Sequence, residues 1–132
     1  VIEDNNLHDR VSVKIDVSNT DLFYYYTKSI AIILPSLYEG FGIPLLEGVY
    51  YNKNILCSDI DIFNEIGIDY VIYFNPYDIA DISNKINLYI KKETKDKKSD
   101  IRKKILKKYS WTNTSKQIFY AINKLSLQIN ER

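Results

Sequence analysis

Two glutamates, Glu39 and Glu47, are the candidate chemical groups of this chain. The segment between them holds two of the four glycines in the sequence, Gly40 and Gly42. Because glycine has no Cβ, backbone N–H groups beside it can approach a ligand closely. A carboxylate accepts hydrogen bonds at both oxygens, so each glutamate could take the hydroxyls of a ribose diol or of a sugar. The pattern predicts a site that binds hydroxyl groups.

An apolar strand and a helix start should position this loop. Residues Ile30–Leu34 are a continuous, β-branched run, which favours a strand covered on both faces of a parallel sheet. Pro44 suits the first turn of a helix, and Glu47 lies about one turn further on. The first-turn N–H groups of a helix lack intrahelical partners at its positive dipole end, which favours a diphosphate there. We therefore expect this helix start to favour an anion such as a diphosphate.

The motif resembles that of the retaining family 4 glycosyltransferases. Their signature, two glutamates with seven residues between them, is matched by Glu39 and Glu47, with Gly40, Phe41, Gly42 and Pro44 in between. Similar elements follow at Asn54–Ile60 (a strand with a Ser-Asp ending), Phe63–Gly67 (a helix end), Tyr73–Asp78 (a strand end) and Tyr109–Trp111 (an aromatic-Ser-Trp element). The resemblance runs from about Arg10 to about Ile122.

The resemblance implies an α/β fold, a Rossmann-like parallel sheet with flanking helices, as part of the second domain of a GT-B fold. Residues 1–132 would be an N-terminally truncated nucleotide-sugar-binding domain, since the chain has no methionine. The N-terminal acceptor domain and the Arg and Lys pair that neutralises the diphosphate would lie outside it. The chain alone is therefore expected to be inactive.

The same resemblance implies retaining transfer of a sugar from a nucleoside diphosphate-sugar to a glycan, lipid or other hydroxyl acceptor, with no metal and no further cofactor. Glu47 would hold the ribose, and backbone groups from Phe41 to Ile43 would hold sugar and phosphate oxygens. Glu39 would contact the donor sugar and, as a further hypothesis, stabilise charge on the anomeric carbon as the catalytic residue. The implied donor-binding set is Glu39, Gly40, Phe41, Gly42, Ile43, Pro44 and Glu47. Two other interpretations stay open, a non-catalytic nucleotide-sugar-binding module and a structural domain with a degenerate site.

Asp59-Ile60-Asp61 offers a metal-binding alternative. An Asp-x-Asp pattern after an apolar strand is also the metal-binding signature of an unrelated glycosyltransferase fold, in which two carboxylates hold a divalent ion at the diphosphate. The predicted helix N-terminus beside the glycines and the family resemblance make a metal unnecessary here. We therefore expect no metal at this site.

Composition limits the class of protein. A chain of 132 residues that is 45% hydrophobic has enough apolar side chains for one domain core. Cys57 is the single cysteine, so no intrachain disulfide can form, which suits a reducing compartment. No apolar run approaches the roughly 20 residues of a membrane span, and no signal peptide is visible. We expect a cytoplasmic location.

Charge is unevenly distributed. The net charge is +7 over residues 91–108 and −8 over residues 1–90. In the basic block, Ile101, Ile105 and Leu106 recur at helical spacing, which favours a solvated lysine face. The alternative is peripheral contact with an anionic membrane on its cytoplasmic face, where each basic residue could add about 1 kcal/mol. No nucleic-acid motif accompanies these charges, so nucleic acid is not an expected partner.

Strands and helices should alternate along the chain, as in a parallel sheet with ligands at the carboxyl ends of its strands. Predicted strands are Val11–Val17, Ile30–Leu34, Asn54–Ser58 and Val71–Phe74. The first predicted helices are Asp21–Lys28, which Ser18 caps, one that starts at Pro44, and Ile62–Ile66. Two further helices are predicted from apolar residues on one face: the first carries Ile79, Ile82, Ile86 and Ile90, and the last carries Ile118, Ile122, Leu125 and Ile129. A helix end and loop should fill Lys91–Asp100.

Asn52 stands where the family usually has a glycine, and it tolerates the left-handed backbone of a helix end.

Overall fold

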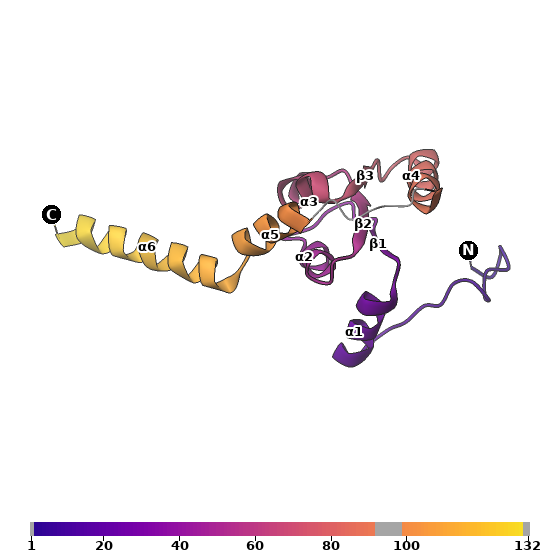
Figure 1. Cartoon of the computed structure of the whole chain (residues 1–132), viewed down its shortest axis with the longest axis horizontal. Coiled ribbons are helices and arrows are strands. Elements are labelled where there is room, and N and C mark those ends of the chain that lie inside the picture. Colours follow the sequence, from indigo (N-terminus) through magenta and orange to yellow (C-terminus); the bar gives the residue numbers. More distant parts are fainter. Residues whose placement is uncertain (1, 92–98, 131–132) are drawn as a thin grey trace.

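A three-stranded parallel sheet forms the centre of the molecule (Figure 1). The computed structural model describes residues 2–91 and 99–130, with the side chains of the last helix as far as Ser126. The strand order is β1-β2-β3, where β1 is Ala31–Leu34, β2 is Asn54–Ser58 and β3 is Ile72–Phe74. This arrangement confirms the predicted α/β class and three of the four predicted strands.

Helices follow each strand and cover the sheet. They are α1 (Asn19–Lys28), α2 (Ile43–Tyr50), α3 (Asp61–Gly67), the 3₁₀ turn η1 (Ile68–Tyr70), α4 (Ile79–Lys91), α5 (Ser99–Lys108) and α6 (Trp111–Asn130). Helices α2, α3 and α5 lie together beside the sheet, and α6 extends away from the body (Figure 1). The Oγ of Ser18 accepts a hydrogen bond from the N–H of Asp21 at 3.2 Å, which confirms the predicted cap of α1.

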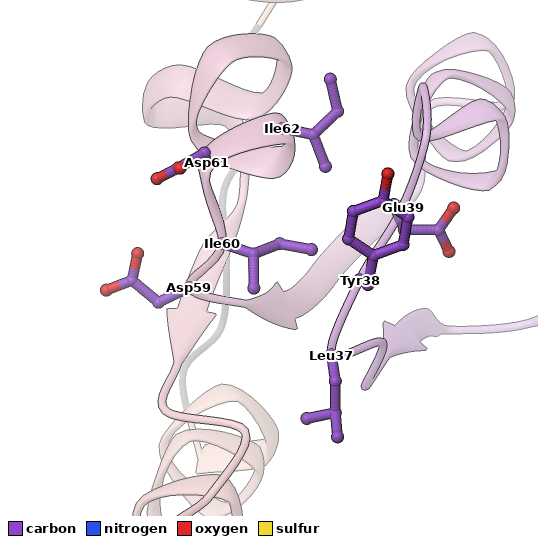
Figure 2. Close-up of a pocket in the computed structure, with 7 residues that line it drawn as sticks. All are labelled: Leu37, Tyr38, Glu39, Asp59, Ile60, Asp61 and Ile62. Atoms are coloured by element: carbon purple, nitrogen blue, oxygen red, sulfur yellow. The ribbon is translucent and has the colours of Figure 1, made fainter.

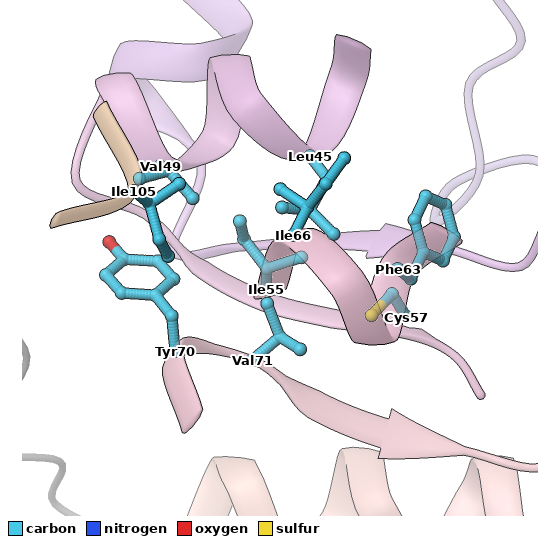
Figure 3. Close-up of a cluster of buried hydrophobic side chains, with 9 residues drawn as sticks. All are labelled: Leu45, Val49, Ile55, Cys57, Phe63, Ile66, Tyr70, Val71 and Ile105. Atoms are coloured by element: carbon cyan, nitrogen blue, oxygen red, sulfur yellow. The ribbon is translucent and has the colours of Figure 1, made fainter. Parts of the chain in front are cut away.

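The main core lies between the sheet and helices α2, α3 and α5. Its buried members are Leu45, Val49, Ile55, Cys57, Phe63, Ile66, Tyr70, Val71 and Ile105 (Figure 3). Side chains along a strand alternate between faces, so Leu56, between Ile55 and Cys57, points to the opposite face of β2 and is also buried. Strand β2 is thus covered on both faces. Helix α4 contacts β3.

Gly48 allows α2 to approach the sheet closely. A Cβ at this position would lie 2.7 Å from Cδ1 of Ile55 and 3.0 Å from Cδ1 of Ile32. The helix then ends as the sequence predicts, with Asn52 in the left-handed region at φ 54°. The N–H of Lys53 donates to the carbonyl of Gly48 and that of Asn52 to the carbonyl of Val49, the pattern of a Schellman motif.

Two predictions about strands are wrong. Val11–Val17 is not a strand: Val13 and Ile15 are 67% and 82% exposed, and no other strand pairs with the segment in the part of the chain that the structure describes. Alternation gives a segment the pattern of a strand, but only hydrogen bonds to a neighbouring strand make it one. Strand β1 is not covered on both faces either. It lies at the edge of the sheet, and Ile33 is 44% exposed.

The later helices lie where the sequence predicts them, and their apolar faces are only partly covered. In α4, Ile82 and Ile86 are half-buried, whereas Ile79 and Ile90 are exposed. Helix α5 confirms the helical spacing in the basic block, with Ile105 buried and its lysines exposed. The stripe on α6 is exposed at Ile118, Ile122 and Leu125, and the side chain of Ile129 lies outside the described residues. Most of the predicted loop at Lys91–Asp100 also lies outside them.

Candidate functional site

The glycine loop joins the carboxyl end of β1 to the first turn of α2. Gly42 adopts the left-handed conformation, with φ 75° and ψ 39°, directly before the helix. Its carbonyl accepts hydrogen bonds from the N–H groups of Leu45 and Leu46 at 3.1 and 3.2 Å. Pro44 lies in the first turn, as predicted. The Cβ of any other residue at position 42 would lie 3.2 Å from Cδ1 of Ile66, so glycine is needed for both conformation and space.

The N–H groups of Phe41, Gly42 and Ile43 lie at the start of α2, where Phe41 and Ile43 are exposed and Gly42 is buried. Within the described part of the chain, none of the three donates a hydrogen bond to a protein acceptor. Gly40 is exposed, and a Cβ built there meets nothing within 4 Å. The loop therefore presents three consecutive free donors beside a helix N-terminus, an arrangement that suits an anion or sugar hydroxyls.

Glu39 lines a pocket beside this loop. The pocket measures about 400 Å³ and is lined by Leu37, Tyr38, Glu39, Asp59, Ile60, Asp61 and Ile62 (Figure 2). It lies between the segments that follow β1 and β2, where a parallel sheet places its ligands. One oxygen of Glu39 accepts a hydrogen bond from the Oγ of Ser36 at 2.8 Å, which holds the half-buried carboxylate in place.

The two aspartates of the metal-binding alternative do not converge with Glu39. Figure 2 shows the carboxylates of Asp59 and Asp61 pointing away from Glu39, while Ile60 and Ile62 point toward the loop. Asp59 accepts a hydrogen bond from the side-chain amide of Asn64 at 2.7 Å. Over residues 2–91 and 99–130, no group of three or more His, Cys, Asp or Glu side chains could hold a metal ion.

Glu47 lies in different surroundings from Glu39. Its Oε2 accepts a hydrogen bond of 2.8 Å from the hydroxyl of Tyr26 on α1. The Tyr26 ring stacks on Tyr51, with centroids 5.1 Å apart and planes at 15°. Burial, the hydrogen bond to Glu47 and its negative charge raise the pKa of Tyr26 above its ordinary value. Glu47 does not line the pocket that holds Glu39, so the two carboxylates serve two separate places around one loop.

Phe41 connects the loop to the end of α5. Its ring is 52% exposed and meets the ring of Tyr109 edge to face, with centroids 6.1 Å apart. The Tyr109 hydroxyl donates to Oε1 of Glu65 on α3 at 3.2 Å. Tyr109 belongs to the aromatic-Ser-Trp element, which the structure thus brings beside the glycine loop. Its third residue, Trp111, is 89% exposed.

Sequence reasoning missed the side chains that hold the two glutamates. Ser36 stands three residues before Glu39, and this short spacing was a usable signal. Tyr26 stands 21 residues before Glu47 on another helix, and nothing in the local pattern marks it among the twelve tyrosines of the chain. The sequence placed Ile60 between the two aspartates and Ile62 at the start of a predicted helix, and the structure shows that both line the pocket.

The comparisons with known proteins agree on one class. A family model described as glycosyl transferases group 1 matches residues 1–108. The chain is 37% identical over 78 residues to the O-antigen chain mannosyltransferase RfbU of Salmonella typhimurium, covering 59% of this chain and 22% of that protein. It is 29% identical over 106 residues to the O-antigen chain mannosyltransferase B of Escherichia coli, covering 80% of this chain and 28% of that protein. The chain thus spans less than a third of these relatives.

A solved structure shares the fold. The sucrose-phosphate synthase of Thermosynechococcus elongatus superposes with a TM-score of 0.81 over 96% of this chain and 33% of that chain, at 19% sequence identity. At this identity the likeness concerns the fold alone. It includes the parallel sheet and its helices, as expected for a Rossmann-like domain of the GT-B type.

Proposed function

Because the chain belongs to the glycosyl transferases group 1 family, we propose that it supplies the donor-binding half of a retaining glycosyltransferase. In this proposal the intact enzyme moves a sugar from a nucleoside diphosphate-sugar to an acceptor hydroxyl without a metal ion. The observation that carries the proposal is the run of free N–H donors at Phe41, Gly42 and Ile43, which opens helix α2 beside the Glu39 pocket.

Each part of the site has a role in this proposal. The three N–H groups bind diphosphate oxygens, which the positive end of the α2 dipole also favours. Glu39 accepts hydrogen bonds from donor-sugar hydroxyls in the pocket and stabilises positive charge that develops at the anomeric carbon. Glu47 accepts the hydroxyls of the ribose. Two carboxylates beside a diphosphate would repel it unless each faces hydroxyl groups, and the separate surroundings of Glu39 and Glu47 fit that division.

Charge compensation at the site is incomplete in this chain. The residues that line the pocket include Glu39, Asp59 and Asp61 but no Lys or Arg. A diphosphate bound beside this pocket at the start of α2 would depend on N–H donors and a helix dipole, each a modest contribution. We therefore propose that this chain alone binds donor weakly and transfers no sugar, and that cationic groups elsewhere in the longer enzyme complete the site.

The relatives suggest the sugar. Both are named as O-antigen chain mannosyltransferases, so mannose is the first candidate for the transferred group and a glycan hydroxyl the first candidate for the acceptor. We place the reaction in the cytoplasm, where nucleotide sugars are made. Among the described helices, none is long and apolar enough to cross a membrane.

Calorimetry and kinetics test the proposal. The intact protein should bind GDP-mannose or UDP-glucose, and Glu39→Gln should lower turnover at least tenfold while leaving nucleoside diphosphate binding nearly unchanged. Asp69→Asn, at an exposed carboxylate of η1 that does not line this pocket, is the matched control. A Glu39→Gln enzyme with normal turnover would remove Glu39 from the mechanism.

The same measurements distinguish the enzyme from the second candidate, a non-catalytic nucleotide-sugar-binding module. A module would bind the donor and depend on Gly42 and Glu47, but the intact protein would transfer no sugar to any acceptor hydroxyl and would not hydrolyse the donor. The free N–H donors support both candidates equally, whereas Glu39 in its pocket, held by Ser36, favours the enzyme.

A further inference from the structure

Helix α1 supplies a side chain to the proposed ribose site. The hydroxyl of Tyr26 donates to Oε2 of Glu47 across 2.8 Å, although 21 residues separate them along the chain. Helix α1 has no buried residue of its own, yet Tyr26 is the one residue between Asn19 and Lys28 that is not classed as exposed. The contact is therefore made by the side chain of α1 that lies closest to the body of the domain.

Two further contacts hold Tyr26 in place. Its ring stacks on Tyr51, which follows the end of α2. The ammonium group of Lys53 donates hydrogen bonds to the carbonyls of Thr27 and Ser29, at 2.8 and 2.9 Å. These carbonyls belong to the end of α1, where a cation is favoured by the helix dipole. The tyrosine hydroxyl is thus fixed relative to α2.

A fixed hydroxyl beside Glu47 has a definite chemical effect. A carboxylate has about four lone-pair sites on its two oxygens, and the tyrosine occupies one of them on Oε2. The remaining sites, including those on Oε1, stay open to the two hydroxyls of a ribose diol. Ordering a free glutamate on binding costs up to about 2 kcal/mol in lost side-chain freedom, and the tyrosine removes part of that cost in advance.

A phenol suits this task better than a cation would. A lysine or arginine at the same place would pair with the carboxylate and compete with neutral hydroxyls for it. Tyr26 is neutral, and burial together with Glu47 keeps its pKa above the ordinary value, so the hydroxyl remains a donor at physiological pH. It orients the carboxylate and leaves its charge in place.

We propose that Tyr26 is a positioning residue that holds Glu47 in the orientation required to bind the 2′- and 3′-hydroxyls of the donor ribose. This inference rests on the proposed function, which assigns the ribose to Glu47. It extends the donor site to helix α1, a part of the chain outside the glycine loop and its pocket.

The test compares a ribonucleotide with its 2′-deoxy counterpart. Calorimetry of the intact protein would use whichever of GDP, UDP and ADP binds most tightly, together with the 2′-deoxy form of the same nucleotide. Tyr26→Phe keeps the aromatic ring and its stack on Tyr51 and removes only the hydroxyl. Tyr24→Phe, on the same helix, is the matched control because Tyr24 lies two residues, about 200°, around the helix from Tyr26 and its ring contacts that of Tyr25.

We expect Tyr26→Phe to weaken ribonucleotide binding about tenfold and 2′-deoxyribonucleotide binding only about threefold, because the 2′-deoxy form keeps one of the two hydroxyls that Glu47 binds. Tyr24→Phe should leave both affinities within about twofold of the wild type. A general loss of structure would weaken the binding of both nucleotides by the same factor. A change in the ratio of the two affinities therefore indicates that Tyr26 positions Glu47. A double-mutant cycle adds a second test: in a Glu47→Ala background, Tyr26→Phe should change neither affinity.

The possible outcomes distinguish a failure of the role of Tyr26 from a failure of the ribose role of Glu47. If the wild type prefers the ribonucleotide and Tyr26→Phe keeps that preference in full, Tyr26 has no positioning role while the proposed function stands. If the wild type binds no nucleoside diphosphate, or binds ribo and 2′-deoxy forms equally, the ribose role of Glu47 is wrong and the role of Tyr26 is wrong with it. A tenfold loss for the ribonucleotide together with a smaller loss for its 2′-deoxy form supports both.

Discussion

The guanidinium of Arg102 donates a hydrogen bond from Nε to the carbonyl oxygen of Val49 at 2.8 Å. A second bond runs from its Nη2 to the carbonyl of Tyr50. Val49 and Tyr50 are the last two residues of α2, whose final carbonyls have no partner within the helix. One basic residue of α5 thus turns toward the domain and completes the helix that carries the candidate site, while neighbouring lysines face solvent.

Replacing Arg102 should therefore cost stability. Arg102→Leu is expected to lower the free energy of unfolding by about 1–2 kcal/mol, because the carbonyls of buried Val49 and exposed Tyr50 lose a charged donor. Lys104→Leu is the matched control, since Lys104 is an exposed residue of the same helix, and its effect should stay within about 0.5 kcal/mol. Urea denaturation of both variants gives the comparison, and equal effects would contradict the capping role.

The two glycines of the loop should respond differently to alanine. Gly42→Ala places a Cβ on a left-handed residue and 3.2 Å from Cδ1 of Ile66, so we expect a loss of about 1–2 kcal/mol. Gly40→Ala meets open space, and its backbone is not in the positive-φ region, so its stability should change by less than about 0.5 kcal/mol. Thermal denaturation measures both. Similar losses in the two variants would mean that the loop does not depend on the Gly42 conformation.

Alkaline pH should destabilise the fold in part through Cys57. Burial, with a smaller contribution from the charge of Asp59, raises the pKa of the Cys57 thiol from 9.0 to about 12. Above pH 9 the thiol ionises in the unfolded chain but not in the folded one, so its stabilising contribution is full below pH 9 and is lost as the pH rises toward 12. The loss is at most about 1.4 kcal/mol per pH unit.

The comparison with Cys57→Val isolates this titration. The free energy of unfolding of the wild type should fall more steeply between pH 9 and pH 11 than that of the variant, as measured by urea denaturation in buffers of matched ionic strength. Valine conserves most of the volume of the buried side chain and cannot ionise. Parallel curves for the two proteins would show that the folded thiol titrates like the unfolded one.

Apolar residues of the core and of α6 should differ sharply in their effect on stability. Leu45 is fully buried in the main core, and Leu45→Ala should cost about 2–5 kcal/mol. Leu125 lies on α6 and is 59% exposed, so Leu125→Ala should cost less than about 1 kcal/mol. Chemical denaturation compares two substitutions of the same type. A large loss at Leu125 would require a packing partner that the chain does not provide among its described residues.

Much of the fold follows from local sequence. Residues Asn54–Ser58 have an apolar centre, Ile55 to Cys57, between two polar ends, and the structure gives β2 the predicted bounds. The left-handed Asn52 and the cap of α1 by Ser18 were also correct, because both depend on the preference of one residue type for one backbone geometry. The glycosyltransferase resemblance is confirmed by the family match over residues 1–108.

Burial was harder to predict, because it depends on what packs against a segment. Val11–Val17 has the alternation of a strand but finds no neighbour, and Ile33 has the composition of a core residue but lies on an edge strand. The isoleucines of α4 and α6 have helical periodicity, and several of them face solvent. Periodicity reports which side chains share a face of an element; it does not report whether another element covers that face.

The sequence by itself determined the glycine loop, the start of α2 and the identity of the two glutamates, because left-handed glycine, a first-turn proline and a strand-to-helix junction are encoded within a few residues. Only the tertiary structure decided what each glutamate faces. Ser36 and the wall at Ile60 and Ile62 surround Glu39, whereas Tyr26 reaches Glu47 from a separate helix. Such contacts join residues through the packing of whole elements, and no short-range pattern in the chain specifies them.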